Sequence, residues 1–379
     1  MKKVGQITWW RNNYGSILQA IALQNKINEL GDFDCEIICQ YGKKVTSFNN
    51  LKDKLKNDGF FITMKKIFGR YILPKVRKRV KRMEDFVNQN LQISDIEYSD
   101  ANIKESNEKY DVFVCGSDQI WNPGLVALNS IYWLGFVENN KTKFSYAPSN
   151  GITSYSKKDW NQINNNLKTF SSISCREKTG TNAINEVLGN DKCITVLDPT
   201  MLFSPSFWDK YISKTKLIKE DYVFTYLLRG TKEQRKAIVE FAHRNNLIVV
   251  TIPFLDAENI NFYDFKFGDK KNWNADPGDF LALIKNAKYV FTDSYHSTIF
   301  STLYHKNVII FPKIGINQQS RLQNFQKDIL KCDRTISTYN DLDKSIKELD
   351  EINWDSVDKI ITKERKKSIE FLKSSLLDE

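Results

Sequence analysis

The chain has 379 residues, too many for one typical hydrophobic core, so its length predicts two domains that are each large enough to fold alone. Its basic N-terminus precedes an apolar run too short for a signal peptide, and no stretch approaches the roughly 18 apolar residues that span a bilayer. These features predict a cytoplasmic protein. The six cysteines lack the density of a disulfide scaffold and the CxxC spacing of a zinc site, so we expect buried thiols.

The formal net charge of +10 is concentrated in one segment. Residues 65–82 contain nine Lys or Arg and no acidic residue, so the rest of the chain is nearly neutral, which argues against a nucleic-acid partner. Bulky apolar residues interleave with cations across residues 60–82. This pattern fits a helix lying on an anionic membrane surface, and it also fits a solvated basic helix whose apolar side packs on the core.

The first α/β unit is predicted over residues 1–210, with a basic helical insertion at about residues 49–92 that interrupts the alternation of strands and helices. One helix runs from about Ser16 to Leu30, and another follows Arg176. Apolar runs predict strands at residues 4–10, 35–41, 111–115, 143–147, 171–175 and 193–197.

After a linker near residues 204–221, a second, Rossmann-like unit is predicted over residues 220–335. One helix is predicted at residues 232–243, and another begins at Asp276-Pro277, with Asp as N-cap and Pro at the first helical position. Strands are predicted at residues 222–228, 247–252, 289–292 and 308–312. Within residues 350–379, an amphipathic helix at 354–377 is placed to pack back across both units.

The most informative stretch is Tyr289 to Phe300, where an apolar strand runs through a polar elbow into a helix. Free N–H groups at a helix start attract anions, and ligands collect at the carboxyl ends of parallel strands. His296, one of only three His, could act there as general acid or base, and Ser294 and Ser297 could donate to an oxyanion. The alternative is a His that is satisfied structurally.

Two further loops follow predicted strands. In the first, Asn13 precedes Gly15, which lets the backbone approach an anion at a helix start, although an ordinary capped turn has the same pattern. In the second, Ser117, Asp118 and Asn122 surround Trp121, a combination that suits sugar hydroxyls and a stacked sugar ring. The alternative for this loop is an Asx-type turn with Trp121 buried.

Two arginines could clamp a carboxylate or a phosphate. Arg176 directly follows a predicted strand, and Arg321 follows Ser320 beyond the last strand. A surface ion pair between Arg176 and Glu177, and a plain surface Arg321, are the alternatives. No cluster of metal ligands is evident in the sequence, so no metal or cofactor is expected.

Taken together, these residues resemble the polysaccharide pyruvyl transferase family. The order and spacing of the matching segments cover most of residues 4–330. They are Asn13-Tyr14-Gly15, Gly116 to Asn122, Ser174 to Glu177, Leu197 to Thr200, Asp293 to Ser297, and Ser320-Arg321. The resemblance implies two Rossmann-like domains facing a cleft in a GT-B-like arrangement. It also implies transfer of pyruvate from phosphoenolpyruvate to a sugar of a cell-surface polysaccharide, as a ketal.

The resemblance also implies residue roles. His296 would transfer a proton, Asp118 and Asn122 would orient the acceptor, and Arg176 and Arg321 would hold the charges of the donor. Characterised members commonly carry Arg-Leu-His at the elbow, whereas this chain has Ser294-Tyr295-His296, so donor binding is expected to rely on Arg176, Arg321 or Arg229.

Two other functions are compatible with this pattern. One is a GT-B-like glycosyltransferase that uses a nucleotide-sugar, and the other is a non-enzymatic polysaccharide-assembly protein. For the pyruvyl transferase, the basic apolar segment at residues 60–82 would suit a lipid-linked acceptor at the inner face of the membrane.

Overall fold

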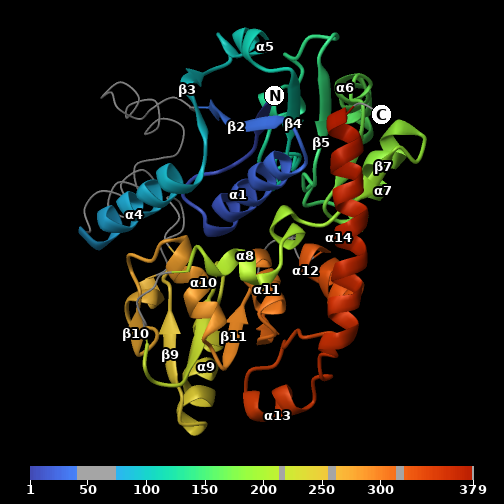
Figure 1. Cartoon of the computed structure of the whole chain (residues 1–379). Helices are drawn as coiled ribbons and strands as arrows, with labels where there is room; N and C mark the ends of the chain where they lie inside the picture. Colours follow the sequence, from blue (N-terminus) through green and yellow to red (C-terminus); the bar gives the residue numbers. More distant parts are fainter. Residues whose placement is uncertain (41–73, 213–217, 255–261, 313–319, 378–379) are drawn as a thin grey trace.

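Two parallel five-stranded sheets with the same strand order form the two halves of the molecule (Figure 1). The structure is a computed structural model that describes residues 1–40, 74–212, 218–254, 262–312 and 320–377. The order is β3-β2-β1-β4-β5 in the N-terminal sheet and β10-β9-β8-β11-β12 in the C-terminal sheet, and every pairing is parallel. This is the strand order of a Rossmann half, so the predicted α/β class with two Rossmann-like domains is confirmed.

The strands are short, and most of their residues are buried. The N-terminal sheet contains β1 (Lys2–Ile7), β2 (Phe33–Gln40), β3 (Ile93–Tyr98), β4 (Val112–Cys115) and β5 (Thr142–Ser145). The C-terminal sheet contains β8 (Tyr222–Tyr226), β9 (Ile248–Thr251), β10 (Lys270–Lys271), β11 (Tyr289–Thr292) and β12 (Asn307–Ile310). A separate parallel pair, β6 (Ile173–Cys175) and β7 (Cys193–Thr195), adjoins β5 through a bridge between Phe144 and Ser172.

Helices connect the strands and cover the sheets. In the N-terminal half they are α1 (Tyr14–Glu29), α4 (Pro74–Asn90), α5 (Ser106–Lys109), α6 (Trp160–Leu167), α7 (Lys178–Leu188) and α8 (Pro205–Asp209). The rest are α9 (Lys232–Arg244), α10 (Pro277–Lys285), α11 (Tyr295–Leu303), α12 (Ser320–Phe325), α13 (Leu342–Lys347) and α14 (Trp354–Leu377). Short turns of 3₁₀ helix include η5 (Pro199–Leu202), and a π-helical turn, η7 (Gln326–Leu330), follows α12.

Side chains at the helix starts explain where several helices begin. Asp276 caps α10 in a reciprocal capping box with Asp279, and Pro277 takes the first helical position, as the sequence predicted. Asn13 accepts hydrogen bonds from the backbone N–H groups of Gly15 and Ser16 at 2.9 and 3.3 Å. These caps satisfy amides that would otherwise have no partner within the helix.

The alternation of strands and helices continues where the sequence predicted an interruption. Helix α4 connects β2 to β3, which lie side by side at one edge of the N-terminal sheet. Strand β3 was not predicted, because three of its consecutive residues, Asp95 to Glu97, are exposed and the segment lacks a continuous apolar run. The described part of the predicted insertion is therefore a crossover helix of the sheet, while residues 41–73 lie outside the described part of the chain.

Helix α4, which contains the described end of the basic segment and continues beyond it, turns an apolar side to the core. Met83, Phe86 and Val87 of α4 are buried, as in a solvated basic helix packed on the core. Arg79 is also buried and donates to the carbonyl of Pro253 at 2.7 Å. Arg82 donates to the carboxylates of Asp276 and Asp279. Both arginines thus contact the C-terminal half, and membrane contact by residues 60–82 stays a prediction.

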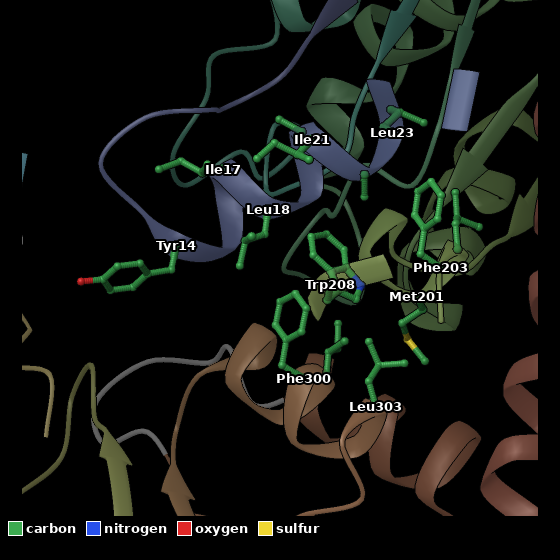
Figure 2. Close-up of a cluster of buried hydrophobic side chains, with 14 of the residues drawn as sticks. Tyr14, Ile17, Leu18, Ile21, Leu23, Met201, Phe203, Trp208, Phe300 and Leu303 are labelled. Atoms are coloured by element: carbon green, nitrogen blue, oxygen red, sulfur yellow. The ribbon is translucent and has the colours of Figure 1, made fainter. Parts of the chain in front are cut away.

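A continuous apolar core joins the two halves. Figure 2 shows Leu18 of α1 facing Trp208 of α8 and Phe300 of α11. The Trp208 and Phe300 rings meet edge to face with centroids 5.1 Å apart, and Tyr14 stacks on Phe280 of α10 at 4.9 Å. Because these side chains are buried, separating the halves would expose a large apolar surface.

Helix α14 lies along both halves (Figure 1). Its Arg365 donates to the carbonyls of Met201 and Phe203, and its Ser368 accepts from the backbone N–H of Leu197. Toward the C-terminal half, Asp358 lies 3.0 Å from His305. Within the described residues, no helix is both long and apolar enough to cross a membrane.

The cysteines are free thiols, as expected. Five of the six are buried, and Cys332 is partly exposed. Cys115 lies on β4 and Cys175 on β6, where a free thiol packs as a small apolar group.

Candidate active site

The two halves approach each other at the loops where the strand order of each sheet reverses. In the N-terminal half these are the loops after β1 and β4, and in the C-terminal half the loops after β8 and β11. Open parallel sheets bind ligands in the crevice at such points. The loops carry Asn13 and Gly15, Ser117 and Asp118, Arg229, and Ser294 with His296.

The start of α1 packs directly against His296. A Cβ atom placed on Gly15 would lie 1.9 Å from Nδ1 of His296, far inside van der Waals contact. Only glycine leaves room for the imidazole ring in this position. The structure therefore brings together two predicted site residues that are remote in sequence and come from different halves.

Asp198 lies between residues from both halves. Its Oδ2 accepts from Nη1 of Arg176 at 2.8 Å and lies 3.4 Å from Nε2 of His296. Its Oδ1 accepts from the backbone N–H and the hydroxyl of Thr200 at 3.0 and 2.6 Å. Burial alone would raise the pKa of Asp198, but His296, Arg176 and Thr200 hold it well below its ordinary value. The carboxylate is therefore charged and fixed.

Arg176 is fully buried among paired groups. Besides Asp198, it binds Glu177 through Nε at 2.9 Å, and its guanidinium lies over the ring of Tyr295 at 4.4 Å. Burial acts to lower the pKa of Arg176, yet Glu177, Tyr295 and Asp198 raise it above its ordinary value. Its Nη2 is buried and has no hydrogen-bond partner among the described residues. This atom can donate to a bound anion.

Arg321 at the start of α12 approaches the same aromatic ring. Its guanidinium carbon lies 5.9 Å from the ring centroid of Tyr295. Burial and the neighbouring Arg176 lower the pKa of Arg321 from its ordinary value. Tyr295 thus has a cation near it from each half, and the alternative of a plain surface Arg321 is wrong.

Asp118 and Ser117 lie at the N-terminal side of the site. The Ser16 hydroxyl donates to the carboxylate of Asp118, which is buried and adopts a left-handed φ of 69°. Besides the larger causes named above, the Asp118 carboxylate acts to raise the pKa of both Arg176 and Arg321, so it lies near both guanidinium groups. Ser117 donates its N–H to Gln19 at 2.9 Å and its hydroxyl to the carbonyl of Ala147 at 2.7 Å, so it holds the loop in place.

The interpretation of Trp121 as a platform for a sugar ring is wrong. Trp121 is fully buried and stacks on Trp133 with ring centroids 4.8 Å apart. The adjacent Asn122 uses both ends of its amide within its own loop: Oδ1 accepts from Gly124, and Nδ2 donates to Gln119. This part of the segment is a buried turn, because an indole gains more from apolar packing than from exposure.

The elbow after β11 has the predicted local structure. Ser294 caps α11, accepting from the backbone N–H of Ser297 at 3.5 Å. The Ser297 hydroxyl is buried without a hydrogen-bond partner in the described part of the chain. The carboxylate of Asp293 accepts from the backbone N–H groups of Leu228 and Arg229, both at 2.7 Å, and so ties the loop after β8 to the elbow.

The other two histidines lie on the surface. His243 is 3.1 Å from Asp269, and His305 is 3.0 Å from Asp358. In the described ranges, no group of three or more His, Cys, Asp or Glu side chains could hold a metal ion.

Three of the surrounding residues were not predicted as site residues: Asp198, Tyr295 and Ser16. Asp198 belongs to the Leu197 to Thr200 segment, which the resemblance includes without giving it a role. An Asp-Pro pair directly after a predicted strand was the available signal, since it places a carboxylate at a sheet edge.

The ionisable side chains described above are here called the ionic cluster: Asp118, Arg176, Asp198, His296 and Arg321. A cavity of about 820 Å³ adjoins this cluster. Arg176, Asp198, Tyr295 and Arg321 are part of its wall. The rest of the wall comes mainly from α7, β7, α12 with η7, and α14. This volume lies within the range of small-molecule sites, roughly 300–1,000 Å³.

Comparisons with solved structures support the fold. A UDP-N-acetylglucosamine 2-epimerase from Rickettsia bellii is 9% identical, with a TM-score of 0.52 and 100% of both chains covered. Another UDP-N-acetylglucosamine 2-epimerase is 10% identical, with a TM-score of 0.53, and 98% of this chain and 95% of that chain are covered. At these identities the likeness shows the GT-B-like fold alone.

The N-terminal domain of a trehalose-6-phosphate phosphatase from Candida albicans is also similar. It is 10% identical, has a TM-score of 0.50, and 99% of this chain and 96% of that chain are covered. In the comparison with curated proteins, no sequence matched. Residues 13–312, however, match the family described as polysaccharide pyruvyl transferase. Because the match spans most of the chain and includes the loops of the site, the protein belongs to the polysaccharide pyruvyl transferase family.

Proposed function

We propose that the protein transfers the enolpyruvyl group of phosphoenolpyruvate to a sugar of a cell-surface polysaccharide or its precursor, forming a pyruvate ketal. Family membership supports polysaccharide pyruvylation in general. The observation that carries the finer proposal is the buried cluster in which Asp198 joins Arg176 to His296. This cluster contains guanidinium groups that can bind an anionic donor. It also contains His296 as the proposed proton donor, beside the fixed carboxylate of Asp198.

The donor has a carboxylate and a phosphate, and the site offers two guanidinium groups. Arg176 and Arg321 approach Tyr295 at 4.4 and 5.9 Å, and both line the cavity, so in this proposal Nη2 of Arg176 and the Arg321 guanidinium contact the donor. The start of α11 adds the Ser297 hydroxyl and helix-start amides. Ser294, which stands where characterised members commonly carry Arg, serves as the helix cap, so in this proposal the donor is held by Arg176 and Arg321.

The proposed reaction then has two steps, an addition followed by a displacement. His296 gives a proton to the methylene carbon of the enol, and one sugar hydroxyl adds to the neighbouring carbon, with Asp118 accepting the hydroxyl proton. A second hydroxyl displaces phosphate from that carbon and closes the ketal. The proton of this second hydroxyl leaves with the phosphate. The bonds that break are the C=C π bond, the C–O bond to phosphate, the N–H bond of His296 and two sugar O–H bonds. The bonds that form are one C–H bond, two C–O bonds, and one O–H bond each on Asp118 and phosphate. Asp198, whose Oδ2 lies 3.4 Å from Nε2 of His296, positions the imidazole ring.

The test is release of inorganic phosphate from phosphoenolpyruvate with a panel of sugar acceptors. We expect acceptor-dependent release by the wild type and loss of at least 99% of it in His296→Ala, with His243→Ala as control because His243 lies in a surface pair with Asp269. Full transfer by His296→Ala would contradict the catalytic role. Thermal stabilisation by a nucleotide-sugar without phosphate release would favour the glycosyltransferase, and neither response would favour an assembly protein.

We also propose that the basic segment brings a lipid-linked acceptor to the site by contacting anionic lipid. Of its described cations, Lys75, Arg77, Lys78 and Lys81 are exposed, whereas Arg79 is buried and Arg82 is paired. Changing the four exposed cations to Gln should abolish binding to vesicles that contain phosphatidylglycerol. The control changes four exposed lysines elsewhere, and unchanged binding of the first variant would contradict membrane contact.

A further inference from the structure

The cavity beside the ionic cluster extends beyond what the donor needs. Its inner wall includes Arg176, Tyr295 and Arg321, so a ligand inside it reaches the site described above. Phosphoenolpyruvate is much smaller than a cavity of about 820 Å³. The remaining space is bounded by α7, η7 and α14 and is therefore available to a second substrate.

The outer wall of this cavity is rich in lysine. Helix α7, the turn η7 with the residue that follows it, and helix α14 contribute exposed lysines, here called the lysine rim: Lys178, Lys327, Lys331, Lys363 and Lys367. The acidic residues of the outer wall are fewer: Asp191, Asp328 and Glu364. The carboxylate of Glu364 lies 4.0 Å from the ammonium group of Lys367 and compensates part of the positive charge of the lysine rim. An excess of cations remains at the rim, and it attracts anions.

The wall also carries uncharged polar groups. Asn182 and Asn324 present side-chain amides, and Thr181 and Thr195 bond to each other through their hydroxyls at 2.8 Å. Amides and hydroxyls are the usual partners of sugar hydroxyls. The cavity thus combines cations of the donor site, neutral polar groups and the lysine rim.

We propose that this cavity binds the acceptor, and that the acceptor is a sugar esterified to phosphate or diphosphate whose anion contacts the lysine rim. The inference rests on the proposed function, since the sugar must face the donor held by Arg176 and Arg321. A neutral sugar would satisfy the amides but would leave the excess of cations at the rim uncompensated. A free sugar phosphate and a lipid-linked sugar diphosphate share the chemistry that the rim recognises.

Direct binding tests the subsite without turnover. The variant Lys327→Glu/Lys331→Glu reverses two exposed rim charges, and Lys344→Glu/Lys347→Glu on α13 makes the same change away from the cavity. Calorimetric titration with inorganic pyrophosphate should give a dissociation constant at least tenfold larger for the rim variant and within twofold of wild type for the control. No binding to wild type, or equal binding by both variants, would overturn the proposal.

Steady-state kinetics then tests the acceptor class. Phosphate release is measured with hexose 1-phosphates, with the matching methyl glycosides, and with a polyprenyl diphosphate sugar in detergent. For the rim variant, KM for whichever phosphorylated acceptor is used should rise at least tenfold, while KM for phosphoenolpyruvate and for the glycosides stays within twofold. Turnover of the hexose phosphate indicates a soluble acceptor, and turnover of only the polyprenyl substrate indicates a lipid-linked one.

The two proposals fail in different ways. If the rim variant loses pyrophosphate but no acceptor supports phosphate release from phosphoenolpyruvate, the subsite stands and the proposed reaction is wrong. If phosphate is released but the rim variant affects glycosides and sugar phosphates equally, the reaction stands and the anionic subsite is wrong.

Discussion

The ionic cluster and the apolar core between the two halves are built on the same two helices. Near the start of α1, Gly15 and Ser16 contact the cluster, and the next residues, Ile17 and Leu18, belong to the core. In the same way, α11 supplies His296 to the cluster and, one turn later, Phe300 to the core (Figure 2). Because each helix is rigid, the apolar packing of its later residues also fixes the position of the groups at its start.

The two regions differ in what they contribute to stability. Burying apolar side chains is favourable, whereas burying charges costs free energy that a fixed partner only partly offsets. Asp198 and Arg176 are both fully buried, and each bonds to more than one group. We infer that the apolar core holds the halves together and that the cluster is maintained for chemistry.

The strongest test of this comparison removes the charge of Asp198. Asp198→Asn leaves Arg176 and His296 without their shared carboxylate, so we expect kcat to fall on the order of 10³-fold. The loss of a buried partner should also lower the free energy of unfolding by about 3 kcal/mol. Urea denaturation and phosphate-release assays measure the two effects. Normal kcat with a shifted stability would contradict the positioning role.

The same variant predicts a pH dependence. Because the folded pKa of Asp198 lies below its unfolded value of about 3.9, its ionised form stabilises the fold above that value, and the contribution is lost as the pH falls below it. The difference in unfolding free energy between wild type and Asp198→Asn should therefore shrink between about pH 5 and pH 2. A difference that stays constant over this window would show that the charge of Asp198 is not what stabilises the fold.

The apolar core is tested by Trp208→Ala. Trp208 is fully buried and contacts Phe300 and α1, so its removal should lower the free energy of unfolding by about 3 kcal/mol. Leu125→Ala is the control, since Leu125 is 55% exposed and should cost less than about 0.5 kcal/mol. Equal effects of the two changes would mean that the core between the halves contributes little.

Gly15→Ala probes the boundary between the two regions. The added methyl group would displace the ring of His296, so kcat should fall about 100-fold, as a misplacement of about 1 Å does, and the overpacking should lower the free energy of unfolding by about 1–3 kcal/mol. Gly135→Ala is matched to it, because a Cβ there meets nothing within 4 Å. A Gly15→Ala enzyme with wild-type kcat would show that the position of His296 does not limit catalysis.

The smallest expected change in the free energy of unfolding comes from Arg82, at the edge of the interface between the two halves. Arg82→Ala removes the pairs with Asp276 and Asp279 and should cost about 1 kcal/mol, because the Arg82 side chain is 31% exposed. Lys81→Ala, one residue away on an exposed position, should change the unfolding free energy by less than about 0.5 kcal/mol. If Lys81→Ala costs as much, general charge rather than the specific pair is responsible.

Local signals explain which parts of the fold could be predicted. The elbow at Ser294 and the start of α10 at Asp276 combine a cap with a change of hydrophobic periodicity, and both were predicted correctly. Strand β3 was missed because hydrogen bonds to β2 make it a strand, although its side chains are largely exposed. Pairing with a distant strand leaves no periodic pattern in such a segment.

The site required contacts between distant residues. Arg176, His296 and Arg321 were selected from their positions after strands, but the carboxylate of Asp198 that joins Arg176 to His296 is recognised only from the tertiary structure. Trp121 was misread for a related reason, since nothing in its neighbours Ile120 and Asn122 shows that Trp133 covers it.

Helix α14 has a mechanical consequence. The chain passes from the N-terminal half to the C-terminal half after α8, and α14 returns to the first half, where Ser375 bonds to Ser172 at 2.8 Å. These two connections between the halves lie at separate places. Any opening of the halves is therefore expected to be a rotation about the line that joins the two connections. Since α14 also forms part of the cavity wall, such a rotation would change the width of the entrance through which an acceptor must pass.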